Sequence, residues 1–224
     1  MNYFPWGPTR LTSSVVLKPV EQPVTFDYLL KIVVVLDESG SMQSIKEQMI
    51  KSINDLIMEQ KQVKNSPATF TLVKFNDVIN RTIQNKPLTD IKLLSHSDYT
   101  PNGTTALYDA IGSTVEWFRN EKNVLMVIVT DGQENASKQF TKSDITKMID
   151  EKKRENNWTY VYLSSDLSTQ IQGNNIGLQE SITTSNCQVS HKKFGDFIGH
   201  TLNNAIKISR ETGITVQCQL NGAL

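Results

Sequence analysis

Three short clusters of oxygen-bearing side chains contain groups that can bind a metal ion. The clusters are Asp37-Glu38-Ser39-Gly40-Ser41, Gly103-Thr104-Thr105 and Thr130-Asp131-Gly132. Carboxylates and hydroxyls with no cysteine or histidine beside them in sequence suit a hard divalent cation, with Mg²⁺ preferred over Ca²⁺ and Zn²⁺. Taken singly, each cluster also fits a helix cap or a tight turn. Three clusters of one chemical type favour a metal site if the fold brings them to one place.

The pattern of apolar residues predicts the elements that would position these clusters. Apolar, largely β-branched runs at 29–37 and 123–131 are typical of strands covered on both faces, and each run ends in a cluster. Further strands are predicted at 68–75, 77–84, 159–166 and 214–220, and helices at 42–57, 107–118, 141–149 and 192–210. Because strands alternate with helices, we predict a doubly wound α/β sheet with helices on both faces. Ligands bind such sheets at the carboxyl ends of the strands, where the clusters should lie.

Composition and charge exclude several classes of function. The chain has 224 residues, with 23 Lys plus Arg against 23 Asp plus Glu, and its formal net charge is zero. Because no long-range field attracts it to phosphates or anionic lipids, we do not expect a nucleic-acid-binding or membrane-surface protein. No apolar run approaches the roughly 20 residues that cross a bilayer, and the first residues do not resemble a secretory signal. We therefore expect a cytoplasmic protein without membrane insertion.

The two ends of the sequence differ from its middle. Four of the seven prolines lie in residues 1–28, which predicts an extended N-terminal arm. Residues 213–224 alternate between apolar and polar side chains and predict a strand-like tail, which leaves 29–212 as the domain. Cys187 and Cys218 lack histidines at zinc-ligand spacing, so two reduced thiols are expected.

The three clusters together resemble the signature of a known family. The Asp-x-Ser-x-Ser of residues 37–41, the GTTALYDAI around Thr105 and the IVTDG that contains Asp131 resemble the metal-ion-dependent adhesion site of the von Willebrand factor type A domain family. The motifs occur in the family's order, and the resemblance extends over about 29–210. It implies a three-layer αβα fold around a mostly parallel sheet with one antiparallel edge strand.

The resemblance also implies a role for each matching position. Ser39 and Ser41 would bind the ion through their hydroxyls, and Thr105 would bind it directly in the ligand-competent state. Asp37 and Asp131 would hold metal-bound waters or the ion itself. The implied ion is Mg²⁺ or Mn²⁺, and every ligand position of the family's site is present in this chain.

One ligand position has an alternative. The family usually has Gly-Gly-Thr where this chain has Gly103-Thr104-Thr105, and the Leu-Tyr-Asp-Ala that follows favours Thr105 over Thr104. Asp109, on the same predicted helix, is expected to face solvent or to cap local structure rather than to bind metal.

The family resemblance implies a protein partner. Mg²⁺ takes six oxygen ligands, and neutral hydroxyls leave most of its charge uncompensated. A Glu or Asp of a partner protein would then complete the shell, and binding in the family can be coupled to a shift of the last helix, here 192–210.

Two other functions fit parts of the pattern. An Asp at the end of a first strand also begins haloacid-dehalogenase-type phosphatases, but these have a second Asp where this chain has Ser39, and the TDGQEN motif ends in Asn135. Other enzyme motifs are absent, so no enzymatic activity is expected. The third reading is a structural scaffold that acts without metal.

Overall fold

The computed structural model describes residues 29–64, 66–165, 167–179, 184–188 and 191–212. The predicted N-terminal arm (1–28), the predicted tail (213–224) and Cys218 lie outside the described residues. Within the described part, no helix is long and apolar enough to cross a membrane.

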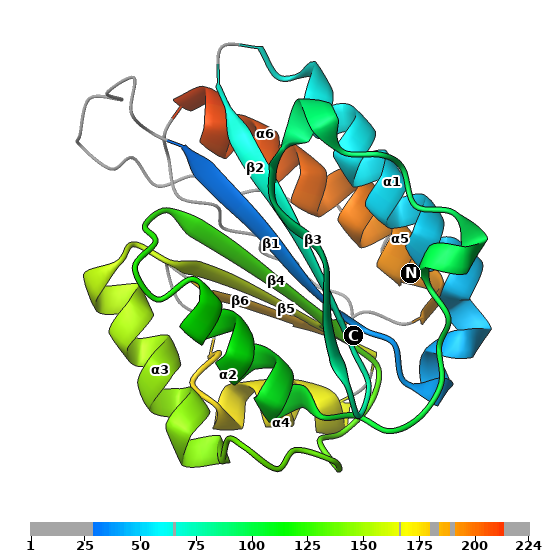
Figure 1. Ribbon diagram of the computed structural model, residues 1–224, viewed down its shortest axis with the longest axis vertical. Helices are drawn as coiled ribbons and strands as arrows, with labels where there is room; N and C mark the ends of the chain where they lie inside the picture. The colour runs from blue at the N-terminus through cyan, green and yellow to red at the C-terminus, as the bar shows by residue number, and fades with distance from the viewer. Residues whose placement is uncertain (1–28, 65, 166, 180–183, 189–190, 213–224) are drawn as a thin grey trace, which may run out of the picture.

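A six-stranded sheet forms the centre of the domain (Figure 1). Its strands are β1 (Leu30–Asp37), β2 (Ala68–Phe75), β3 (Ile79–Pro87), β4 (Val124–Thr130), β5 (Thr159–Ser164) and β6 (Thr184–Gln188). They lie in the order β3-β2-β1-β4-β5-β6, and only β3 is antiparallel to its neighbour. From β1 the chain adds β2 and β3 on one side, and it then returns to add β4, β5 and β6 on the other side. This confirms the predicted doubly wound sheet and its antiparallel edge strand.

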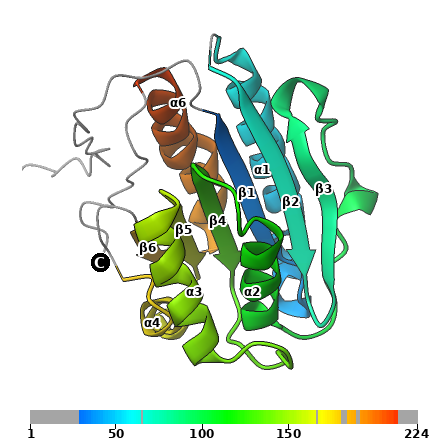
Figure 2. The same cartoon turned by 60° about the vertical axis from the view of Figure 1, so that its left-hand side comes forward.

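Helices cover both faces of the sheet. They are α1 (Lys46–Gln62), α2 (Leu107–Trp117), α3 (Lys142–Glu155), α4 (Leu167–Asn175), α5 (His191–Asp196) and α6 (Asn203–Thr212), with a 3₁₀ turn at Gly40–Ile45 and a π-helical turn at Phe197–Leu202. The first and last helices, α1, α5 and α6, lie on one face, and α2, α3 and α4 lie on the other (Figures 1 and 2). The three-layer αβα prediction is therefore confirmed.

Alternating side chains of the central strands build two cores. Ile32 and Val34 of β1 pack with the apolar face of α1, whereas Val33 and Val35 pack with α2 and α3. This follows from the two-residue period of a strand, which sends successive side chains to opposite faces. Because both faces are buried, β1 has no polar residue between Ile32 and its end at Asp37.

The second half of the domain differs from the sequence prediction in two places. Helix α4 and strand β6 were not predicted. Helix α4 buries Thr169 and Gly173 and exposes its apolar residues Leu167 and Ile171. Such a helix has no apolar stripe for a periodicity argument to detect.

The predicted single helix 192–210 consists of α5, the π-helical turn and α6. Just before the wide turn, Gly195 lies against α1, where an added Cβ would be 2.8 Å from Gln48 Nε2. The irregular turn follows the close approach of Gly195 to α1, and it buries Phe197, Ile198 and Leu202. The spacing of apolar residues did not reveal this break in the helix.

Candidate metal centre

The carboxyl ends of β1 and β4 bring two of the three predicted clusters together. The strands are parallel neighbours in register, with Leu36 opposite Val129, so Asp37 and Asp131 lie at the same edge of the sheet. The Ser41 hydroxyl donates to Asp131 Oδ1 over 2.5 Å. The Ser41 and Ser39 hydroxyls are 3.2 Å apart and share a hydrogen bond. The first and third clusters therefore form one network of oxygen atoms.

Thr105 brings the second cluster to the same place. A Cβ added to Gly132 would lie 2.9 Å from Thr105 Oγ1 and 3.8 Å from Asp37 Oδ2, so these groups surround one small space. Thr105 is buried, whereas Thr104 is exposed. The placement favours Thr105, as the sequence prediction had it, and the five predicted residues now lie at one site.

Asp37 is the most strongly perturbed carboxyl of the site. It is fully buried, and it accepts hydrogen bonds from the Ser39 amide and the Thr130 hydroxyl, each over 2.7 Å. Burial raises its pKa to about 6, the two hydrogen bonds work against this, and the charge of Asp131 adds to the rise. Two negative charges this close, those of Asp37 and Asp131, destabilise each other when no cation lies between them. The electrostatics of the site therefore favour a bound positive ion.

The loop between β4 and α3 is fixed to the segment that contains Thr105. The Thr105 amide donates to Asn135 Oδ1 over 2.9 Å, and the Asn135 amide donates back to the Thr105 carbonyl over 3.0 Å. Asn135, which in the sequence counted only against a phosphatase, thus holds the backbone of a predicted ligand.

Two further carboxylates hold the same loop. Asp109 is buried and accepts the backbone N–H groups of residues 138, 139 and 140 at 2.7 to 2.9 Å. Of the two predicted alternatives for Asp109, capping of local structure is therefore correct. Glu134 accepts from the amides of Tyr108, Ala136 and Ser137. The Ser137 hydroxyl also donates to Glu134, over 2.7 Å, so Glu134 and Ser137 form a local pair three residues apart that the sequence analysis did not single out.

Residues before the second cluster support Asp37 from the other side. The Tyr99 hydroxyl donates to the Asp37 carbonyl over 2.5 Å. Glu38 accepts from the Thr100 amide over 2.6 Å and pairs with Lys74 Nζ at 2.8 Å, with both side chains nearly buried. This stretch lies between the predicted strand 77–84 and the predicted helix 107–118, and it braces the strand end that bears Asp37.

The donor set fits a hard divalent cation. Among the described residues, no group of three or more His, Cys, Asp and Glu could hold a metal ion, so a site here would depend on hydroxyl ligands as well. The site instead offers two carboxylates and three hydroxyls, and the missing side chain of Gly132 leaves space between Thr105 and Asp37. These residues would hold Mg²⁺ or Mn²⁺.

Gly132 gives a direct test of this space. We expect Gly132→Ala to weaken Mn²⁺ binding at least tenfold, about 1.4 kcal/mol, because the new methyl displaces the Thr105 hydroxyl. The measurement is isothermal titration with MnCl₂. Gly40→Ala is the matched control, since its Cβ would meet only the Gly103 carbonyl at an ordinary 3.6 Å. Equal affinities of the two variants would contradict the assignment of this space to the ion.

Comparisons with known proteins agree with this architecture. The model of the von Willebrand factor type A domain family matches residues 31–188. No curated protein matches the chain. Among solved structures, proximal thread matrix protein 1 from the mussel byssus is 19% identical, with a TM-score of 0.58 over 82% of this chain and 47% of that one. The minor pilin PilB from Streptococcus sanguinis is 12% identical, with a TM-score of 0.61 over 86% of this chain and 64% of that one.

A third similar structure is a von Willebrand factor type A protein from Catenulispora acidiphila, 12% identical, with a TM-score of 0.57 over 81% of this chain and 42% of that one. The chain spans about half the length, or less, of the first of these similar structures. At these identities the structural likenesses establish the fold alone.

Proposed function

This chain belongs to the von Willebrand factor type A domain family, and from that premise we propose that it is an interaction module that binds a protein partner through one Mg²⁺ or Mn²⁺ ion. The ion would be held by the five oxygen-bearing residues of the three clusters. A Glu or Asp of the partner would complete its coordination shell. Membership of the family supports the general role in protein interaction, and the residues of this chain support the dependence on metal.

The convergence of the three clusters at the carboxyl end of β1 is the observation that supports the proposal most. The hydroxyls of Ser39 and Ser41 and the carboxylate of Asp131 already form a hydrogen-bonded chain. Ser41 is exposed, whereas Asp37 lies at the bottom of the site. The bound ion would supply a positive charge that neutral hydroxyls leave uncompensated. The exposed side of the site is where a partner's carboxylate would approach.

The phosphatase alternative gains no support from the geometry. Such an enzyme needs a second carboxylate two residues after Asp37, and Ser39 occupies that position with its hydroxyl on Ser41. Asn135, where the acidic motif would continue, is bonded to the Thr105 backbone. We therefore favour a module without catalytic activity.

Metal uptake tests the site. Isothermal titration of the full chain with MgCl₂ or MnCl₂ should show one ion bound, and the melting temperature should rise with metal concentration because only the folded state binds. The double variant Ser39→Ala with Ser41→Ala should lose both effects. Ser143→Ala is the control, because this exposed serine lies at the start of α3, outside the three clusters. Unchanged uptake in the double variant would contradict the site assignment.

The metal dependence of partner binding tests the function. Affinity purification with the chain as bait, in Mg²⁺ and in EDTA, should recover a partner only with metal. Changing the partner's acidic residue to its amide should abolish capture. Recovery of the same proteins under both conditions would favour the metal-independent scaffold.

A further inference from the structure

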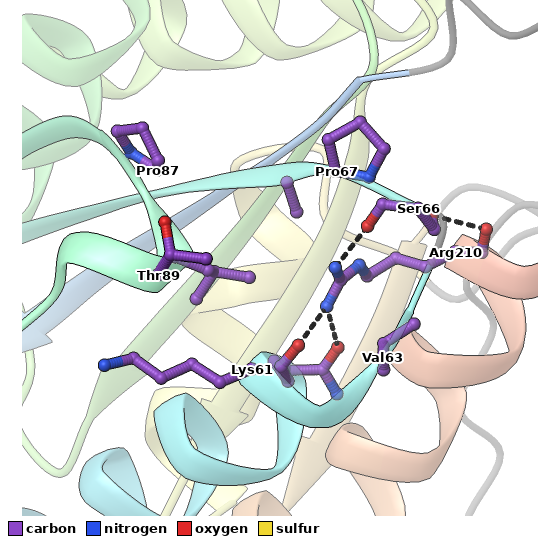
Figure 3. Close-up of a pocket in the computed structure, with 10 residues that line it drawn as sticks. Lys61, Val63, Ser66, Pro67, Pro87, Thr89 and Arg210 are labelled. Atoms are coloured by element: carbon purple, nitrogen blue, oxygen red, sulfur yellow. Dashed lines mark hydrogen bonds between the residues drawn. The ribbon is translucent and has the colours of Figure 1, made fainter.

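A cavity of about 310 Å³ lies at the opposite end of the sheet from the metal centre. It opens between the end of α1, the start of β2 and the end of β3, and Arg210 of α6 closes one side (Figure 3). Strand β2 separates it from the metal centre by seven residue steps, roughly 23 Å. The two sites are therefore distinct.

The Arg210 guanidinium lines this cavity and forms no direct ion pair with any residue that the structure describes. Arg210 is 5% exposed. Nη1 donates to the Gln60 carbonyl over 2.6 Å and to Gln60 Oε1 over 3.0 Å, and Nη2 donates to the Ser66 carbonyl. These contacts join α6 to the end of α1 and explain why an arginine stands there. All three acceptors are neutral, and Nε is buried with no hydrogen-bond partner in the described part of the chain.

A second cation adds to the positive charge of the cavity. Lys61 also lines it, and its ammonium donates to the Ile91 carbonyl over 2.6 Å, which is again a neutral acceptor. Among the described residues that line the cavity there is no Asp or Glu. Burial lowers the pKa of Arg210, and the charge of the neighbouring Glu211 offsets this only in part. An anionic ligand would relieve this imbalance.

The remaining walls define what kind of anion fits. They are mostly apolar and come from Val63, Pro67, Ala68, Pro87 and Leu88. A phosphate group has many oxygens to satisfy, whereas three of the five N–H groups of Arg210 already donate within the protein and the ammonium of Lys61 already donates to Ile91. A carboxylate needs fewer donors, and an attached short apolar chain would contact the walls. The volume is at the lower end of the range for small-ligand pockets.

We propose that this cavity binds a small organic carboxylate whose short apolar chain packs on Pro67, Pro87 and Leu88. The carboxylate lies beside the guanidinium of Arg210, and Lys61 contributes a second positive charge. The apolar chain displaces water from the walls. Binding here does not require the metal ion.

The test uses the full chain in EDTA, with hexanoate as the probe and hexanamide as its neutral analogue. In two-dimensional amide NMR, hexanoate should shift the signals of Ala68, Leu88 and Thr89 in a saturable way. Hexanamide should bind at least tenfold more weakly, because it lacks the charge that the two cations attract. Equal binding of the two probes, or no saturable shift with hexanoate, would overturn the proposal.

Two variants locate the site. Lys61→Met should weaken hexanoate binding about five- to tenfold, whereas Lys64→Met, an exposed lysine outside the cavity, should not change it. Arg210→Met should abolish binding if the variant folds, as judged by circular dichroism. If it does not fold, the Lys61 and Lys64 pair still decides the question. Unchanged affinity in Lys61→Met would overturn the proposal. Because EDTA removes the metal ion, the result of this experiment does not depend on whether the proposed metal centre is correct.

Discussion

Asp37→Asn should abolish binding of Mg²⁺ or Mn²⁺ and, in EDTA, should make the fold more stable than the wild type. The carboxylate is fully buried beside Asp131, and hydrogen bonds from Ser39 and the Thr130 hydroxyl offset the cost of burying its charge only in part. An asparagine removes the charge and keeps an oxygen for the Ser39 amide. The same residue is therefore expected to support binding and to reduce stability, as is common at functional sites.

The pH dependence in EDTA follows from the pKa of Asp37, which burial raises to about 6 from its usual 3.8. The folded wild type holds its proton more tightly than the unfolded chain does. The cost of the charge is therefore absent below about pH 4 and complete above about pH 6. At pH 7 the variant should gain about 1 to 3 kcal/mol in free energy of unfolding.

Urea denaturation of both proteins in EDTA, from pH 4 to pH 7, measures this difference. Asp77→Asn is the control, because Asp77 is an exposed carboxylate near the site and its loss should change neither stability nor metal binding. An Asp37→Asn variant that is less stable than the wild type at pH 7 would show that the buried charge is not a cost.

Asp109→Asn should destabilise the domain and loosen the metal centre together. The carboxylate accepts three consecutive backbone N–H groups of the loop between β4 and α3. An asparagine can accept through one oxygen only, and its amide group would face the N–H of Lys138. A buried donor without an acceptor costs about 1 to 3 kcal/mol, and loss of a charged acceptor costs more, so we expect about 2 to 4 kcal/mol.

The loop also contains Gly132 and Asn135, so its loosening should weaken Mn²⁺ binding several-fold. Urea denaturation and Mn²⁺ titration of the same samples measure the two effects. Asp144→Asn is the control: its carboxylate accepts from the Thr141 amide at the exposed start of α3. This variant should show a much smaller loss of stability and normal metal binding. Equal losses in both variants would mean that Asp109 has no special role at the site.

The strands that position the metal centre were predictable because their burial leaves a clear sequence pattern. Strand β1 is apolar from Ile32 to Leu36 and ends in Asp37, and β4 is apolar from Val124 to Val129 and ends in Thr130, directly before Asp131. The capping pair of Thr141 and Asp144 was recognisable for a similar reason, since both partners are side chains three residues apart. Local patterns of this kind need no knowledge of the tertiary fold.

The supports of the site could not be predicted in the same way. Asp109 and Asn135 bind backbone groups about 30 positions away in the sequence, which only the fold brings near, so no pairing of residue types marks them. The Glu38 and Lys74 pair joins residues far apart in the sequence. Helix α4 exposes its apolar residues and buries small ones, which reverses the usual signal.

The position of the last helices in the chain has a consequence for synthesis on the ribosome. The ribosome has added every predicted metal ligand and Asn135 by the time it reaches residue 136. The residues that cover the apolar face of α1, Phe197, Leu202 and Ile206, are added much later. At 5 to 20 residues per second, roughly 4 to 14 s separate the two events. During that interval the nascent chain holds all the groups of its binding site while the flank of α1 remains uncovered. A chaperone that recognises apolar helices is expected to act in this interval.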